Sequence, residues 1–191
     1  MKEKVKNQLK KWIKGDLRDL YWRIYGHTIR NPMCQAPPKS FLFICKGNIC
    51  RSPFAEHLAR KLAVNAVRSE NAFYSAGLQV SKPLPPPKEA ILAAESFGIQ
   101  LNSHKSRKIT QEMLESFDMI IAMETWQVQA AKKAFPNYKE KIFLLPLFYT
   151  KDWVKRGGFS RFNIQDPYGK NLYEFHACFN RIKACIEGLL G

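Results

Sequence analysis

A cysteine, an arginine and a serine lie close together in the stretch FLFICKGNICRSP, residues 41–53. Cys45 ends an apolar run, and Arg51 and Ser52 follow it just before a predicted helix. A cysteine thiolate is a nucleophile, and a guanidinium can bind two oxygens of one phosphate. The amides of a turn into a helix N-terminus also favour an anion. This spacing therefore predicts a site that binds a tetrahedral oxyanion and holds a nucleophile against it.

Alternating strands and helices along residues 41–190 predict the framework for this site. We expect strands at 41–45, 72–76, 118–123 and 141–145, and helices at 53–67, 87–98, 126–135 and 172–190, with a short helix capped by Thr110. Such alternation predicts an α/β fold, a doubly wound four-stranded parallel sheet with helices on both faces. Ligands of these sheets bind beyond the carboxyl ends of the strands, where Cys45 is expected to lie.

Residues 1–40 differ in composition from the rest of the chain. They hold ten Lys and Arg but only three acidic residues, and so carry +7 of the net charge of +15. Apolar residues spaced three and four apart predict an amphipathic helix over 3–25, and a Pro-containing linker follows at 31–39. We therefore predict two parts, a basic amphipathic helix with its linker at 1–40 and a catalytic domain at 41–191.

The basic charge indicates anionic partners, which include nucleic acid, anionic lipid and phosphorylated substrates. No zinc-finger, RNA-recognition or helix-turn-helix pattern is present, so we expect no specific nucleic acid partner. The four histidines are dispersed, so we expect no metal, and nothing indicates another cofactor. Five scattered cysteines are not a disulfide framework, and no apolar run is long enough to span a membrane. These features predict a cytoplasmic protein.

The stretch CKGNICRSP resembles the phosphate loop of the low-molecular-weight protein tyrosine phosphatases of the bacterial type. The likeness continues, in the order of the family, through YSAGL (Tyr74–Leu78), SHKSRKI (Ser103–Ile109), DMIIAM (Asp118–Met123) and DPYGK (Asp166–Lys170). It covers residues 41–190 and leaves residues 1–40 as an N-terminal extension.

The resemblance implies a role for each of three catalytic residues. Cys45 would be the nucleophile that forms a phosphocysteine, and Arg51 would clamp the phosphate and the transition state. Asp166 would protonate the leaving phenol and then activate water. Asn48 would hold the loop in its strained shape, with Ser75 and His104 in the supporting hydrogen-bond network. The predicted substrate-binding residues are Lys46, Gly47, Asn48, Ile49, Cys50, Ser52 and Tyr168.

Three further properties follow from the resemblance. Members that hydrolyse phosphoarginine carry Thr at the position of Ile49, so the apolar Ile49 favours phosphotyrosine. Gly169 follows Tyr168 where many members have a second aromatic residue, which predicts a more open pocket. Cys50 is expected to trap Cys45 as a reversible disulfide under oxidation.

Three alternatives to a phosphotyrosine phosphatase stay open at this point. They are a phosphoarginine phosphatase, a thiol-coupled arsenate reductase on the same fold, and a non-enzymatic phosphate-binding module. The reductase would need a redox pair, but Cys178 and Cys185 lie on one face of the last predicted helix, and we interpret them as core residues.

The expected substrate is a phosphotyrosine protein, such as a bacterial tyrosine kinase. Residues 3–25, with Trp12, Tyr21 and Tyr25 on an apolar stripe and lysines opposite, have the composition of a helix in a membrane interface. The alternative is that the stripe packs on the domain or on a partner. With a membrane-bound helix, the protein would act at the inner membrane surface.

Overall fold

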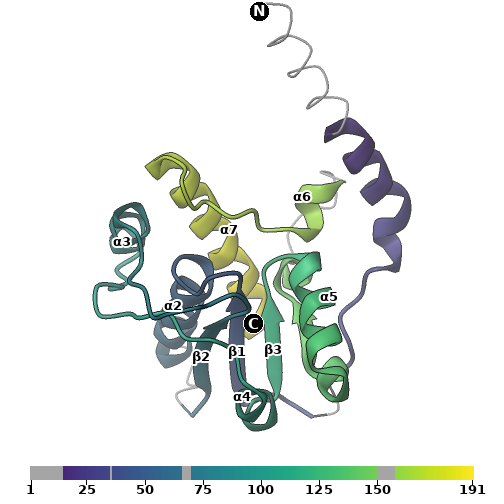
Figure 1. The fold of residues 1–191 in the computed structure, drawn as a ribbon, viewed down its shortest axis with the longest axis horizontal. Helices are drawn as coiled ribbons and strands as arrows, with labels where there is room; N and C mark the ends of the chain where they lie inside the picture. Colours follow the sequence, from purple (N-terminus) through teal and green to yellow (C-terminus); the bar gives the residue numbers. More distant parts are fainter. Residues whose placement is uncertain (1–14, 35, 66–69, 150–157) are drawn as a thin grey trace, which may run out of the picture.

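The computed structural model describes residues 15–34, 36–65, 70–149 and 158–191. Four strands form one sheet: β1 (Ser40–Cys45), β2 (Ala72–Gly77), β3 (Met119–Ala122) and β4 (Ile142–Leu144). The helices are α2 (Arg51–Asn65), α3 (Lys88–Glu95), α4 (Gln111–Ser116), α5 (Thr125–Ala134), α6 (Phe159–Phe162) and α7 (Leu172–Leu190), and the 3-10 helices are η1 (Gly26–Thr28), η2 (Pro136–Lys141) and η3 (Leu145–Phe148). All strand pairs are parallel, in the order β2-β1-β3-β4 (Figure 1).

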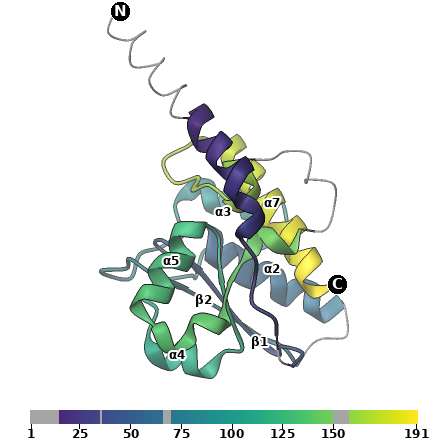
Figure 2. The ribbon, with the colours of Figure 1, turned by 90° about the vertical axis from the view of Figure 1, so that its right-hand side faces the viewer.

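The sheet separates two apolar cores. Successive side chains of a strand point to opposite faces, and β1 follows this rule along its whole length. Phe41, Phe43 and Cys45 belong to the core under α2, α3 and α7, whereas Leu42 and Ile44 belong to the core under α4 and α5. Figure 2 shows α4 and α5 on one side of the sheet and α2, α3 and α7 on the other. The predicted doubly wound fold is therefore confirmed.

The predicted strands are all present, and the helix boundaries differ by a few residues. Helix α2 begins at Arg51 and not at Pro53, because a proline is tolerated inside a first turn, whose amides have no partner within the helix. Helix α3 stops at Glu95, and Gly98 adopts a positive φ of 66° in the turn that follows. Helix α6 and the 3-10 helices are too short to give a periodic pattern, and the sequence did not predict them.

The N-terminal extension is anchored to the sheet. Asn31 pairs with the backbone of Leu144 at the outer strand β4, accepting from its N–H at 2.7 Å and donating to its carbonyl at 3.2 Å. Asp118 Oδ2 accepts from the backbone N–H groups of Lys39 and Ser40, both at 2.9 Å. The Asn31 side chain thus forms hydrogen bonds that a further strand would form at this edge. The Asp118 carboxylate holds the other end of the linker.

The structure describes the predicted N-terminal helix from residue 15 to 25, and its earlier residues lie outside the described part. One face of this helix contacts α6. Asp19 Oδ1 accepts from the N–H of Phe159 at 3.0 Å, and the Trp22 ring lies 5.5 Å from that of Phe162. Gly26 packs so closely on Phe162 that a Cβ would lie 2.4 Å from the ring. The division of the chain near residue 40 stays a prediction.

Candidate active site

The loop between β1 and α2 lies at the point where the strand order reverses. Strand β1 has β2 on one side and β3 on the other. The connection after β1 therefore leads toward one edge of the sheet, and the connection after β3 leads toward the other. Such a point leaves a crevice at the carboxyl ends of the strands, which is where open α/β sheets bind ligands. Cys45 is the last residue of β1, and Glu124 follows the end of β3. Both residues therefore border this crevice.

The thiol of Cys45 is buried and surrounded by hydrogen-bond donors. The backbone N–H of Asn48 donates to Cys45 Sγ at 3.2 Å, and Ser52 Oγ lies 3.1 Å from the same sulfur. Arg51 is the first residue of α2 and directly follows the loop. A thiolate at Cys45 would thus face a helix N-terminus, a hydroxyl and an amide, all of which stabilise negative charge.

Asn48 holds the loop in a conformation that few side chains adopt. Its φ is +53°, in the left-handed region that asparagine tolerates better than most residues. Its Nδ2 donates to Ser52 Oγ and Ser75 Oγ, both at 2.9 Å, and its Oδ1 accepts from the N–H of Arg107 at 3.0 Å. His104 Nε2 donates to the Asn48 carbonyl at 2.9 Å. Ser75 and His104, the predicted supporting residues, therefore both form hydrogen bonds with Asn48.

A buried glutamate extends this network and was missed by the sequence reasoning. Ser75 Oγ donates to Glu56 Oε2 at 2.6 Å, and Arg60 donates to Glu56 Oε1 at 2.8 Å. Hydrogen bonds thus run from a surface arginine through Glu56, Ser75 and Asn48 to the Ser52 hydroxyl beside the thiol. The spacing of Glu56 and Arg60, one helical turn apart on a helix that begins at the loop, was the available signal.

Arg51 is fully buried and held by three oxygen acceptors. Its Nη1 donates to Glu124 Oε1 and, at 2.9 Å, to the carbonyl of Ile164, while Nη2 lies 2.7 Å from Asp166 Oδ2. Its Nε is buried and has no hydrogen-bond partner within the described part of the chain. Sequence reasoning missed Glu124, although a carboxylate directly after a strand next to β1 is placed at the site by the carboxyl-end rule.

Burial and neighbouring charges shift the pKa values of three groups at the site. Burial opposes the charge of Arg51, but Cys45, Asp166 and Glu124 outweigh it and raise the pKa of the guanidinium above its ordinary value. Burial, followed by the nearness of Cys45 and Asp166, raises the pKa of the Cys50 thiol. Burial lowers the pKa of His104, which favours the neutral ring that donates to Asn48. Arg51 is therefore permanently charged, and Cys50 stays a thiol at neutral pH.

A cavity of about 220 Å³ opens over the loop. Eight of the predicted site residues line it, namely Cys45, Lys46, Gly47, Ile49, Cys50, Arg51, Asp166 and Tyr168. Two predicted substrate-binding residues, Asn48 and Ser52, do not line it, because both are fully buried beneath the loop. The segment after β2 supplies further lining residues that the sequence did not suggest, which are Gln79, Val80, Ser81, Lys82 and Leu84, with Ser106 beyond them.

The close approach of this segment to the loop depends on Gly77. A Cβ at Gly77 would lie 3.0 Å from the backbone N of Asn48 and 2.6 Å from Val80 Cγ2. A larger residue would push the segment after β2 away from the loop, and the cavity would lose that wall.

Cys178 and Cys185 lie on α7, and their side chains are buried in the protein. Both are buried, and burial raises the pKa of each thiol to about 12. Cys178 donates weakly to the carbonyl of Gln165 at 3.7 Å. A redox pair needs accessible thiolates, so the interpretation of these two cysteines as core residues is confirmed by their burial.

The likeness to known proteins covers the part of the chain that builds this site. The family model described as "Low molecular weight phosphotyrosine protein phosphatase" matches residues 40–191. The chain belongs to this family. The phosphatase is therefore an enzyme, a phosphoric monoester hydrolase.

The names of the phosphatase's relatives indicate more than one substrate specificity. The protein named low molecular weight protein-tyrosine-phosphatase Etp, from Escherichia coli strain K12, is 30% identical over 155 residues, which are 81% of this chain and 95% of Etp. A protein-arginine-phosphatase of Bacillus subtilis is 32% identical over 131 residues, which are 69% of this chain and 81% of that protein. The crystal structure of the Erwinia amylovora tyrosine phosphatase amsI matches with a TM-score of 0.69 and 26% identity, covering 83% of this chain and 95% of amsI. The N-terminal extension lies outside the family match.

Proposed function

We propose that the phosphatase hydrolyses phosphotyrosine in proteins through a phosphocysteine intermediate. One observation carries this proposal, namely that Cys45, Arg51 and Asp166 line a single cavity, with the arginine 2.7 Å from the aspartate. The buried Arg51 Nε–H, which lacks a partner within the described residues, supports phosphate binding there, because a phosphate oxygen would satisfy it.

The first step transfers the phosphoryl group to sulfur. The Cys45 thiolate donates an electron pair to phosphorus, and the bond from phosphorus to the tyrosine oxygen breaks. Asp166, protonated at this stage, gives its proton to the leaving oxygen, so the tyrosine side chain of the substrate protein departs as the neutral phenol. Arg51 and the loop amides bind the equatorial oxygens, on which negative charge is spread in the transition state.

The second step returns the enzyme to its starting state. The Asp166 carboxylate accepts a proton from water, and the water oxygen attacks phosphorus. The bond from phosphorus to sulfur then breaks, and inorganic phosphate leaves. Ser52 Oγ, 3.1 Å from Cys45 Sγ, donates to the departing thiolate and makes it a better leaving group.

The cavity wall favours an aromatic leaving group. Ile49, Val80, Leu84 and Tyr168 give it apolar and aromatic lining. A phenyl ring gains by burying its surface against such a wall, whereas the guanidinium of phosphoarginine gains no hydrogen bond from the side chains of Ile49, Val80 and Leu84. Phosphoarginine is nevertheless the second candidate, because the Bacillus subtilis relative is named a protein-arginine-phosphatase. The proposed physiological substrate is a phosphotyrosine protein such as a bacterial tyrosine kinase.

Parallel assays of the full-length protein on phosphotyrosine, phosphoarginine and phosphoserine peptides test this proposal. We expect hydrolysis of phosphotyrosine well above that of the other two. Cys45→Ser should abolish turnover but still bind inorganic phosphate, because Arg51 and the loop amides remain. A preference for phosphoarginine would overturn the proposed specificity, and substantial turnover by Cys45→Ser would overturn the mechanism.

A further inference from the structure

The N-terminal helix, residues 15–25, exposes apolar side chains on one continuous face. Leu17, Leu20, Tyr21 and Ile24 follow the spacing of one helix face, and each is more than half exposed. Tyr25 beside them is 52% exposed. A stripe with this spacing ordinarily faces a protein core. We call these five residues the outer face of the helix.

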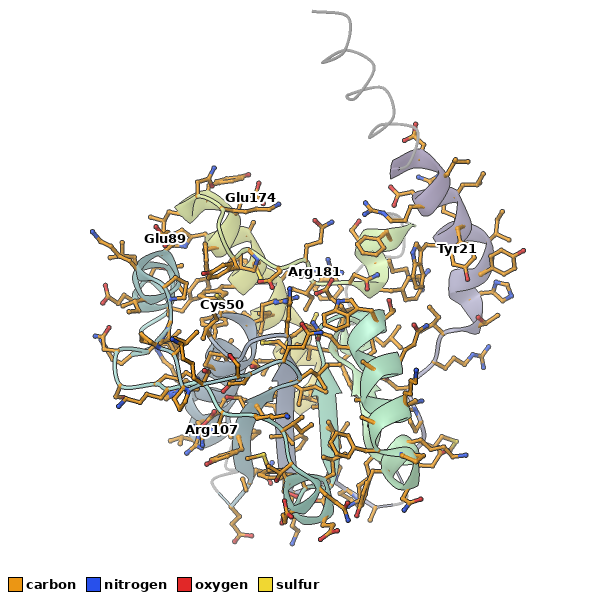
Figure 3. The ribbon with its side chains drawn as sticks, in the orientation of Figure 1. Tyr21, Cys50, Glu89, Arg107, Glu174 and Arg181 are labelled. Carbon is orange, nitrogen blue, oxygen red and sulfur yellow. The ribbon has the colours of Figure 1, made fainter. Side chains whose placement is uncertain are left out.

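The opposite face of the same helix is the one that contacts the domain. Asp19, Trp22 and Gly26 share that face by their spacing, and all three contact α6. Figure 3 shows the helix at the edge of the molecule, where Tyr21 is labelled. The contacts with α6 therefore fix the helix with its outer face toward solvent, and no described residue covers that face.

The charge of the N-terminal region indicates which kind of partner would bind the outer face. Residues 1–14, which precede the described helix in sequence, hold six lysines and one glutamate, a net +5. Arg23 borders the outer face in helical register, while Asp16 on the same border offsets one charge. Like charges repel, so a second copy of this chain, which also carries +15, is disfavoured as an occupant.

We propose that the outer face docks onto an anionic lipid surface. Leu17, Leu20 and Ile24 would enter the boundary between headgroups and acyl chains, as in amphipathic helices that lie in the interface plane. Tyr21 and Tyr25 have the apolar ring and polar tip that such interfaces favour. The basic residues of the N-terminus would add attraction to acidic headgroups.

The geometry makes this attachment compatible with catalysis. The face used for lipid is opposite the face used for α6, so the helix can hold both at once. Figure 1 shows the helix beside α6, at the end of the molecule toward which the strands point. The proposed docking therefore requires no movement of any site residue.

Vesicle co-sedimentation of the full-length protein tests the proposal. The vesicles are phosphatidylcholine alone, or phosphatidylcholine mixed with phosphatidylglycerol, at low and at high salt. The double variant Leu20→Glu/Ile24→Glu changes the outer face. Its matched control is Val64→Glu/Leu92→Glu, which alters two other exposed apolar residues and changes the net charge equally.

We expect the unaltered protein to sediment with the anionic vesicles at low salt and less at high salt, because screening weakens the headgroup attraction. Leu20→Glu/Ile24→Glu should lower the partition coefficient at least about tenfold, since two apolar groups leave the interface and two anions enter it. The control should lose no more than about twofold, the effect of its charge alone.

Several results would overturn the proposal. They are no sedimentation with anionic vesicles, equal loss in the two double variants, and equal binding to the neutral vesicles. Self-association of the protein that Leu20→Glu/Ile24→Glu abolishes, without vesicle binding, would assign the face to a second copy. Hydrolysis of p-nitrophenyl phosphate should be unchanged in all these variants, so a failure here leaves the proposed phosphatase activity untouched.

Discussion

Arg51 Nη2 and Asp166 Oδ2 are 2.7 Å apart, so the proposed phosphate clamp and the proposed general acid are paired with each other. A phosphate dianion needs the same guanidinium edge that Asp166 occupies. Binding of substrate would therefore separate the pair and place a dianion beside the carboxyl group. The pairing thus links phosphate binding to the release of Asp166 for its proposed role in proton transfer.

Asp166→Asn tests the role of this carboxyl in proton transfer. The amide cannot give up a proton, so hydrolysis of phenyl phosphate, with its poor leaving group, should slow by about 10²–10⁴-fold. Hydrolysis of p-nitrophenyl phosphate should slow less, because its leaving group needs less help. Steady-state kinetics with both substrates checks this, and an equal loss on the two would mean that Asp166 only supports the structure.

Glu124→Leu tests how the charge of Arg51 is balanced. Removal of Glu124 leaves the buried Arg51 with Asp166 as its remaining carboxylate partner among the described residues, so the free energy of unfolding should fall by about 3 kcal/mol. Urea unfolding measures the loss. Added phosphate should restore more stability to this variant than to the unaltered protein, because a bound oxyanion supplies the missing negative charge.

The exposed Glu95 provides the control for this variant. Glu95→Leu should change stability by less than about 0.5 kcal/mol, as is usual for surface positions. If Glu124→Leu were as mild as this control, the ion pair with Arg51 would contribute little to the fold.

Ile49→Thr tests the specificity of the loop. The ratio of phosphoarginine to phosphotyrosine hydrolysis should rise by about tenfold, the usual effect of a small change in an apolar pocket. Val80→Thr makes the same kind of change elsewhere in the cavity lining and should leave the ratio nearly as it was. Competition assays with the two phosphopeptides measure both. A shift of equal size in the two variants would show that any hydroxyl in the cavity suffices.

His104 makes stability depend on pH. Folding lowers the pKa of this histidine, mainly through burial, so the folded state binds fewer protons than the unfolded state around pH 6. Its contribution is fully present above the unfolded pKa of about 6.5 and is lost as the pH falls through the lower folded pKa. Replacement by glutamine should therefore flatten the decline in stability over that window.

Urea unfolding at a series of pH values measures this slope. An unchanged slope in His104→Gln would contradict the prediction.

Sequence reasoning found the fold and the loop because both depend on local signals. The alternation of apolar runs with helical periods predicted four strands in the right places, and the loop residues from Cys45 to Ser52 are contiguous. Glu124 and Glu56 were missed because their partners lie far away in the chain, 73 residues from Glu124 to Arg51 and 19 from Glu56 to Ser75. The anchoring of the linker by Asn31 was missed for the same reason, since Leu144 is 113 residues away. Contacts of this range leave no periodic trace in a single sequence.

Trp22→Ala tests whether the N-terminal helix folds as one unit with the domain. The Trp22 ring lies 6.0 Å from Phe159 and 5.5 Å from Phe162, and α6 leads directly to the segment that carries Ile164 and Asp166. Because Trp22 is only half buried, its loss should lower the free energy of unfolding by about 1–2 kcal/mol, less than a core tryptophan would. Leu17→Ala, on the outer face, should have little effect. Urea unfolding followed by far-ultraviolet circular dichroism and by loss of p-nitrophenyl phosphate hydrolysis should give one coincident transition that moves in Trp22→Ala alone. An early helical transition that leaves the main one in place would show that the helix detaches independently of the domain.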